Sequence, residues 1–166
     1  MSNLVELMRQ FVSEEGLKTI DEWVEKYPDD QKKSAVMQTL MIVQEANGYL
    51  TEASMDAVAD YLSMPRIAVY EVASFYSMYQ HAPTGRHHLK VCKSISCKLR
   101  NSQAITTALS DKLKVSLGET TTDGRFTLST VDCLGACVNA PMMQINKQYH
   151  ECLTVENLDD VLEQYL

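Results

Sequence analysis

The sequence predicts a mixed α/β (α+β) protein, in which an N-terminal helical bundle is followed by a domain of alternating strands and helices. Apolar residues recur at helical spacing up to about residue 80, and segments with alternating apolar residues appear only after that point. Hydrophobic residues make up 45% and charged residues 22% of the chain, which is a globular composition. We therefore expect two small domains, residues 1–82 and residues 86–166.

The front half is expected to contain four or five short helices. Val36, Leu40 and Val43 fall at i, i+4 and i+7, as on one face of a helix. Pro28 and Gly48 are each expected to end a helix. Thr51 is expected to be the N-cap of a helix that runs to Leu62, and Ser63 precedes Pro65 at the first turn of the next helix.

A last apolar stripe in the front half has two interpretations. Its members are Ile67, Val72, Phe75, Tyr76 and Tyr79, roughly along one helical face. Such a stripe is most simply part of the core of the domain. If residues of this stripe are exposed, the helices of residues 1–82 are instead expected to dock a partner protein.

The back half is expected to follow the order β-α-β-β-α. Residues 81–88 combine Pro83 and Gly85 without an apolar period and are typical of a linker. Strands are predicted over residues 88–92, 125–131, 142–145 and 148–152, and a helix over 102–113. A last helix is expected after Thr154 as N-cap.

Charge and hydropathy exclude several classes of protein. The net charge is −7, with 13 acidic and 6 basic side chains in residues 1–85 and 9 of each after that. This balance disfavours nucleic acid binding. No run approaches the ~20 apolar residues of a membrane helix, so we expect no direct membrane insertion. The N-terminus resembles neither a secretory signal nor a transit peptide, which indicates a bacterial-type cytoplasmic protein or a trimmed mature form.

Four of the five cysteines form two close pairs, Cys92-x4-Cys97 and Cys133-x3-Cys137. Each pair follows a predicted strand, so we expect its thiols to project from turns and not from a buried face. A [2Fe-2S] cluster needs two thiolates for each iron, which two such pairs can supply. Structural zinc also uses paired cysteines and remains an alternative, as do disulfides, although a cytosolic chain keeps its thiols reduced.

Other residues near the pairs have simpler interpretations. We expect Cys152 to be a small core residue in an apolar strand. His87 and His88 are not needed as ligands beside four cysteines, and Met142 and Met143 are expected to pack in the core. Backbone amides around Gly135 can donate to the sulfurs. The cations near the first pair can favour reduction of a negatively charged cluster, or can be solvated surface: Lys90, Lys93, Lys98 and Arg100.

A longer motif resembles a known family. Residues 123–141 agree with the signature D-x2-F-[ST]-x5-C-L-G-x-C-x2-[GA]-P at every fixed position, and residues 72–77 are also similar to the family. The family is that of the small thioredoxin-like [2Fe-2S] ferredoxin subunits in the NADH dehydrogenase module of respiratory complex I. The resemblance implies a thioredoxin-like [2Fe-2S] ferredoxin domain that holds one [2Fe-2S] cluster. It also implies the cluster ligands, which are Cys92, Cys97, Cys133 and Cys137.

The resemblance further implies the activity and the partners. The chain is expected to be an electron-transfer subunit of a proton-translocating NADH:quinone oxidoreductase, with no catalytic residue of its own. FMN and NADH are expected on a flavin-binding partner, since the glycines form no dinucleotide motif. Further iron-sulfur subunits are expected, and a location at the inner face of the membrane through the complex. Alternatives are the equivalent subunit of an NAD-linked hydrogenase or formate dehydrogenase, or a structural zinc-binding adaptor.

Overall fold

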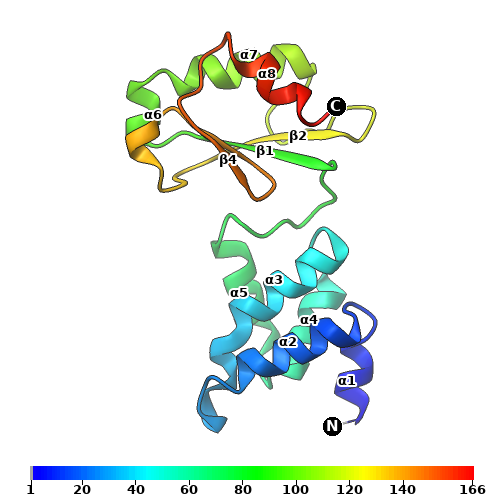
Figure 1. The fold of residues 1–166 in the computed structure, drawn as a ribbon. Helices are drawn as coiled ribbons and strands as arrows, with labels where there is room; N and C mark the ends of the chain where they lie inside the picture. The colour runs from blue at the N-terminus through cyan, green and yellow to red at the C-terminus, as the bar shows by residue number, and fades with distance from the viewer. Residues whose placement is uncertain (1) are drawn as a thin grey trace. The chain divides into compact units, whose positions relative to one another are not determined.

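The computed structural model describes residues 2–166, with side chains described from residue 4 onward. The chain divides into two compact units, Met1–Pro83 and Thr84–Leu166. The first is helical and the second contains the sheet (Figure 1). The expected fold class, a helical bundle followed by an α+β domain, is therefore confirmed. Each unit has its own hydrophobic core and is described separately below.

The front unit consists of short helices, as the sequence predicts. Their bounds are α1 Ser2–Met8, α2 Glu14–Val24, the 3-10 helix η1 Asp29–Ala35, α3 Val36–Asn47, α4 Glu52–Tyr61 and α5 Arg66–Phe75. Gly48 ends α3 with a left-handed φ of 83°, and Thr51 begins α4 in a capping box with Ser54. Both expected boundary residues are confirmed.

The start of α5 and its exposed face differ from expectation. Pro65 lies one residue before the helix, and Ser63 has a positive φ of 54° and precedes that turn. The helix buries Val69 and Ala73 in the core of the front unit. Ile67 and Phe75 are 64% and 80% exposed, so the predicted single stripe is wrong, because helical rotation turns these two side chains outward.

The back unit contains a four-stranded sheet in the order β2-β1-β3-β4. The strands are β1 His87–Cys92, β2 Phe126–Val131, β3 Met143–Ile145 and β4 Gln148–His150. β1 pairs with β2 in parallel and with β3 antiparallel, and β3 pairs with β4 antiparallel. The expected strand order is confirmed, although β1 begins within the segment predicted as the linker.

Helices cover one face of the sheet. The helices of the back unit are α6 Ile95–Leu99, α7 Ser102–Leu113, the 3-10 helix η2 Cys137–Asn139 and α8 Leu158–Glu163. α7 and α8 lie on the same side of the sheet (Figure 1). Leu89 and Val91 of β1 pack there against Leu109 of α7 and Leu158 of α8. The alternation of a strand therefore turns Lys90 and Cys92 toward the other face.

Two predictions for the back unit are corrected by the structure. Cys152 is not a core residue in a strand: β4 ends at His150, and Cys152 is exposed with a left-handed φ of 50°. The last helix begins at Leu158, but Thr154 still makes a reciprocal bond with Asn157 three residues on, as an N-cap does.

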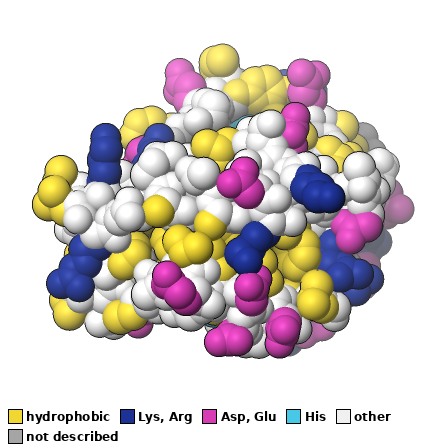
Figure 2. Space-filling view, turned by 90° about the horizontal axis from the view of Figure 1, so that it is seen from above, with side chains coloured by type: hydrophobic (Ala, Val, Ile, Leu, Met, Phe, Trp, Pro, Cys, Tyr) yellow, Lys and Arg dark blue, Asp and Glu magenta, His cyan; other side chains and the backbone are white. Residues whose placement is uncertain are grey.

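The surface over α7 and α8 mixes charges of both signs. Figure 2 shows Lys and Arg side chains interspersed with Asp, Glu and hydrophobic ones, without a large patch of one sign in this view. This agrees with the equal number of acidic and basic residues after residue 85. Within residues 2–166, no helix has the length and apolar character that crossing a bilayer requires.

Candidate metal centre

Parallel pairing of β1 and β2 brings the two cysteine pairs to one edge of the sheet. Cys92 is the last residue of β1 and lies opposite Val131, the last residue of β2. Cys133 follows two residues after Val131, and Cys97 lies five residues after Cys92 in α6. Since parallel strands end at the same edge, segments far apart in sequence meet there.

The first pair is buried, contrary to the expectation that the thiols project from turns. Cys92 is 2% and Cys97 1% exposed, and both pack with Ala140 and Met142. A strand end and a helix, not an open turn, carry these two residues. The Cys92 N–H donates to the Met142 carbonyl at 3.1 Å, and the Cys92 thiol lies 3.9 Å from the Asp132 carbonyl.

The Cys97 thiol has neighbours from both cysteine pairs. Burial raises the pKa of Cys97 to about 11, and a hydrogen bond with Cys92 and the negative charges of Cys92 and Cys137 contribute to this rise. A hydrogen bond from the Met142 backbone opposes this by favouring the thiolate. Burial and the neighbouring cysteines thus favour the protonated form of the Cys97 thiol, with one sulfur of the second pair close by.

The second pair lies in an exposed loop that hydrogen bonds hold in place. Cys133 is exposed, and the Gly135 N–H donates to its sulfur at 3.4 Å, as expected for this amide. Cys137 is also exposed, at the start of η2. The Tyr149 hydroxyl donates to the Leu134 carbonyl at 2.8 Å and so fixes the loop to β4.

The far end of this loop is fixed to the segment around Cys152. The Cys152 N–H donates to the Asn139 carbonyl at 2.8 Å, and the Leu153 N–H to the Pro141 carbonyl at 2.9 Å. The Asn139 side chain also donates to the Glu151 carboxylate at 2.8 Å. Cys152 thus supports the loop of the second pair through its backbone, a role that spacing in the sequence does not indicate.

The donor set suits a metal centre, although the four thiols are not gathered as a complete site. Within residues 2–166, no three His, Cys, Asp or Glu side chains are grouped so that they could hold a metal ion. The structure does place Cys92 and Cys97 in contact and Cys137 near Cys97, with Cys133 in the adjoining loop. Four sulfur donors, two from the end of β1 and α6 and two from the adjoining loop, fit a cluster with two thiolates for each iron.

The cations near the first pair differ in their surroundings. Lys93 is paired with Asp132 at 3.2 Å, and both side chains are exposed. Lys98 and Arg100 are exposed on and just after α6. Lys90 is partly buried in the sheet, and burial lowers its pKa. Of these four cations, only Lys90 is partly buried, so solvent and salt screen its charge less than the charges of the other three.

The histidines and methionines near the pairs occupy other places. His87 and His88 begin β1, at the end of the strand opposite Cys92. The His88 Nε2 lies 2.7 Å from the Ser129 Oγ. Met142 and Met143 are 1% and 0% exposed, so their predicted packing role is confirmed.

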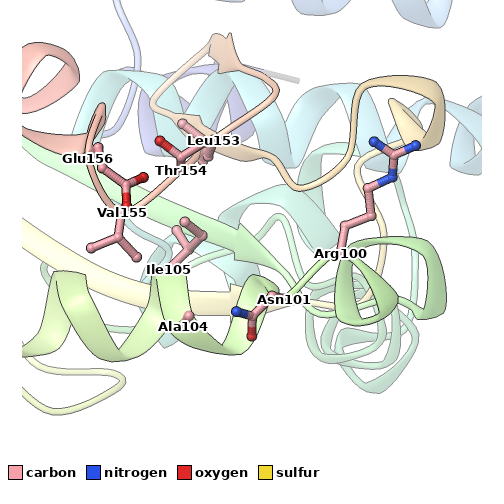
Figure 3. A pocket seen from close by; sticks show the side chains of 8 residues that line it. All are labelled: Arg100, Asn101, Ala104, Ile105, Leu153, Thr154, Val155 and Glu156. Carbon is pink, nitrogen blue, oxygen red and sulfur yellow. The ribbon is translucent and has the colours of Figure 1, made fainter.

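A small pocket lies between α7 and the segment after Cys152, apart from the cysteines. Its volume is about 260 Å³, and it is lined by Arg100, Asn101, Ala104, Ile105, Leu153, Thr154, Val155 and Glu156. In Figure 3 the Arg100 side chain extends away from the other lining residues. Since no cysteine lines this pocket, it is not part of the candidate metal centre.

Fold and site together define a class: a thioredoxin-like domain that carries paired cysteines at and just after the ends of two parallel strands, preceded by a helical unit. The profile of the thioredoxin-like [2Fe-2S] ferredoxin family matches residues 20–166. The chain therefore belongs to the thioredoxin-like [2Fe-2S] ferredoxin family, and its cofactor is one [2Fe-2S] cluster. The resemblance recognised in the cysteine motif is confirmed.

Relatives of known name agree with this family. A subunit of the NADH-quinone oxidoreductase of Rhizobium meliloti is 46% identical over 140 residues, which cover 84% of this chain and 82% of the relative. The corresponding NADH-quinone oxidoreductase subunit of Rickettsia typhi is 44% identical over 144 residues, covering 86% of this chain and 85% of the relative. Both are similar along nearly their whole length.

A solved structure supports the fold. The chain is similar to the crystal structure of an NAD+-reducing [NiFe]-hydrogenase in its H2-reduced state, with a TM-score of 0.66 and 21% identity. The match covers 78% of this chain but only 22% of the hydrogenase chain. At this identity the likeness shows a shared fold.

Proposed function

We propose that this chain is the [2Fe-2S] electron-transfer subunit of a proton-translocating NADH-quinone oxidoreductase, with Cys92, Cys97, Cys133 and Cys137 as the cluster ligands. The observation that carries the ligand assignment is the meeting of both cysteine pairs at one sheet edge, where the pKa of Cys97 responds to Cys92 and Cys137. When bound, such a cluster takes up and gives off electrons one at a time, whereas NADH delivers two.

The residues of the chain itself supply the surroundings of the cluster. Buried Cys92 and Cys97 keep water from one side, with Met142 packed against them. The Gly135 amide donates to the Cys133 sulfur and can spread its negative charge. Bonds from Tyr149 and Cys152 hold the loop that carries Cys133 and Cys137. These contacts fix the backbone of the segments that carry the four cysteines.

The electron donor in this proposal is a flavin- and NADH-binding subunit of the same complex, and further iron-sulfur subunits complete the electron path. None of the six glycines of this chain forms a dinucleotide-binding motif, so FMN and NADH are assigned to that partner. Exposed apolar side chains support docking: Ile67 and Phe75 on α5, and Ile95 and Leu99 on α6. Attachment to the inner face of the membrane would then be through the complex.

The test is purification without oxygen, followed by analysis of iron and acid-labile sulfide. We expect about two irons and two sulfides for each chain, and a low-temperature EPR signal after reduction. Single Cys→Ser variants at the four ligand positions should lose or alter that signal. Cys152→Ser is the matched control, because Cys152 is exposed and acts through its backbone, so this variant should keep wild-type iron.

Three outcomes would contradict parts of the proposal. A colourless chain with one tightly bound zinc and no sulfide would support a structural zinc-binding adaptor instead. Loss of iron from Cys152→Ser, with iron retained in Cys133→Ser, would overturn the ligand assignment. The cluster could also be intact but not reducible by NADH in the presence of the flavin subunit. That result would keep the cofactor assignment and contradict the proposed electron path.

A further inference from the structure

Lys90 lies on the same strand and the same face as Cys92. The two residues are two positions apart in β1, so their side chains point to the same side of the sheet. At about 3.3 Å per residue, their Cα atoms are roughly 7 Å apart. This is the face away from α7 and α8, since Leu89 and Val91 occupy the covered one.

Among the side chains described, from residue 4 onward, no carboxylate pairs with the positive charge of Lys90. Its neighbours in register are Ser129 on β2 and Gln144 on β3, which are both uncharged. His88, two residues earlier on the same face, is held neutral because burial and the charge of Lys90 lower its pKa to about 4. Lys90 takes part in none of the ion pairs found among residues 2–166.

The other cations near the cysteines are compensated or screened. Lys93 is bonded to Asp132 at 3.2 Å, and the two side chains are 57% and 91% exposed. Lys98 is exposed on α6. An exposed charge is screened within about 10 Å at ordinary ionic strength, whereas a partly buried one is screened much less. Lys90 is therefore the cation whose field reaches the end of β1 most directly.

We propose that the unpaired positive charge of Lys90 raises the reduction potential of the cluster. Lys90 would then influence electron transfer through its charge. The inference rests on the proposed function, in which Cys92 is a ligand. In that function, the partner's reduced flavin would give one electron to the cluster held in part by Cys92, at the end of β1. Reduction would add one negative charge at that place. A positive charge on the same face favours that change.

The size of the effect follows from Coulomb's law. With an effective dielectric constant of about 20, a unit charge at roughly 10 Å changes a one-electron equilibrium about tenfold. For one electron, a tenfold change corresponds to about 59 mV. We therefore expect Lys90→Met to lower the ratio of reduced to oxidised cluster about tenfold at any fixed potential, relative to the wild type.

The experiment is a redox titration of the purified full chain, followed by EPR, for Lys90→Met, Lys90→Gln and Lys90→Arg. The two neutral variants should show the lowered potential, and Lys90→Arg should stay near the wild type because it keeps the charge. Lys93→Met is the matched control, with a change of less than about twofold expected, since Lys93 is paired and exposed. The Lys90 effect should persist at high salt.

The outcomes separate this inference from the ligand assignment. Neutral variants with a wild-type EPR spectrum and a wild-type potential would overturn the role of Lys90 and leave the ligands untouched. Loss of the cluster from both neutral variants, with retention in Lys90→Arg, would also overturn it, in favour of a role in holding the cluster. A wild-type chain that binds no iron would instead contradict the proposed function.

Discussion

The four proposed ligands are unequal in their surroundings. Cys92 and Cys97 are buried among apolar side chains, whereas Cys133 and Cys137 lie in an exposed loop. Burial disfavours a thiolate, and this is the main reason why the pKa of Cys97 is raised to about 11. Iron binding would have to remove that proton from a buried sulfur, whereas solvent reaches Cys133 and Cys137 directly. The two pairs are thus expected to differ in how readily they accept metal.

A buried histidine makes the stability of the back unit depend on pH. The pKa of His88 is lowered from 6.5 to about 4, chiefly by burial. The unfolded chain therefore binds a proton at a pH where the folded chain does not. Stability that is present above pH 6.5 is lost as the pH falls from there toward 4.

We expect His88→Gln to reduce this loss by about 1 to 2 kcal/mol between pH 7 and pH 5, after allowance for partial screening by solvent. Urea unfolding at the two pH values, followed by circular dichroism, measures it. Circular dichroism is needed because the single tryptophan, Trp23, lies in the front unit. An equal acid loss in the variant and the wild type would contradict this assignment.

At the scale of elements, the capping box of α4 is a separable contribution to stability. The Thr51 hydroxyl accepts the Ser54 N–H at 3.1 Å, and the Ser54 hydroxyl accepts the Thr51 N–H at 2.9 Å. Thr51→Ala should lower the free energy of unfolding of the front unit by about 1 kcal/mol. Fluorescence of Trp23 during urea unfolding measures this. Thr51→Ser, which keeps the hydroxyl, should stay near the wild type, and an equal loss in both variants would argue against the cap.

Elements with a full periodic pattern could be predicted from the sequence, and short ones could not. Residues 102–113 form three amphipathic turns, and α7 has those bounds. α6 has only five residues and shows no period to detect. The prediction for Cys152 was wrong because its apolar neighbourhood resembles a strand, whereas its left-handed φ depends on the turn that leads to α8.

The resemblance of the cysteine motif implies the proposed ligand set, but strand register decides the surroundings of these cysteines. The sequence does not show that Cys92 lies opposite Val131, and this pairing brings Lys93 beside Asp132. The same holds for Tyr149, whose bond to the loop of the second pair spans 15 residues. These contacts link segments whose pairing is fixed only when the sheet forms, so spacing alone could not reveal them.

At the scale of the whole molecule, the front unit has exposed apolar side chains on α5, which we propose as the docking surface for the flavin-binding partner. Ile67 and Phe75 lie eight residues apart on α5, with exposed Glu71 between them on the same face. Two exposed apolar side chains flanking a carboxylate fit a partner surface with apolar pockets around a cation. Neither side chain belongs to the core of the unit, so both can be changed without loss of the fold.

We expect Ile67→Ser with Phe75→Ser to weaken binding of the flavin subunit at least about tenfold, as loss of buried apolar anchors does. The dissociation constant of the purified subunits measures this, and the cluster EPR signal should stay unchanged. Lys18→Ser, at an exposed position of α2, is the control for a surface change on another helix. Unaltered affinity in the double variant would place the docking surface elsewhere.

The position of Cys152 has a practical consequence. With four of the five cysteines bound to iron, Cys152 would remain as the single reactive sulfur, and it is exposed. A maleimide dye would then attach at one known position of the loaded chain. Its emission could report the approach of a flavin, which absorbs visible light, and so could time the assembly of the two subunits.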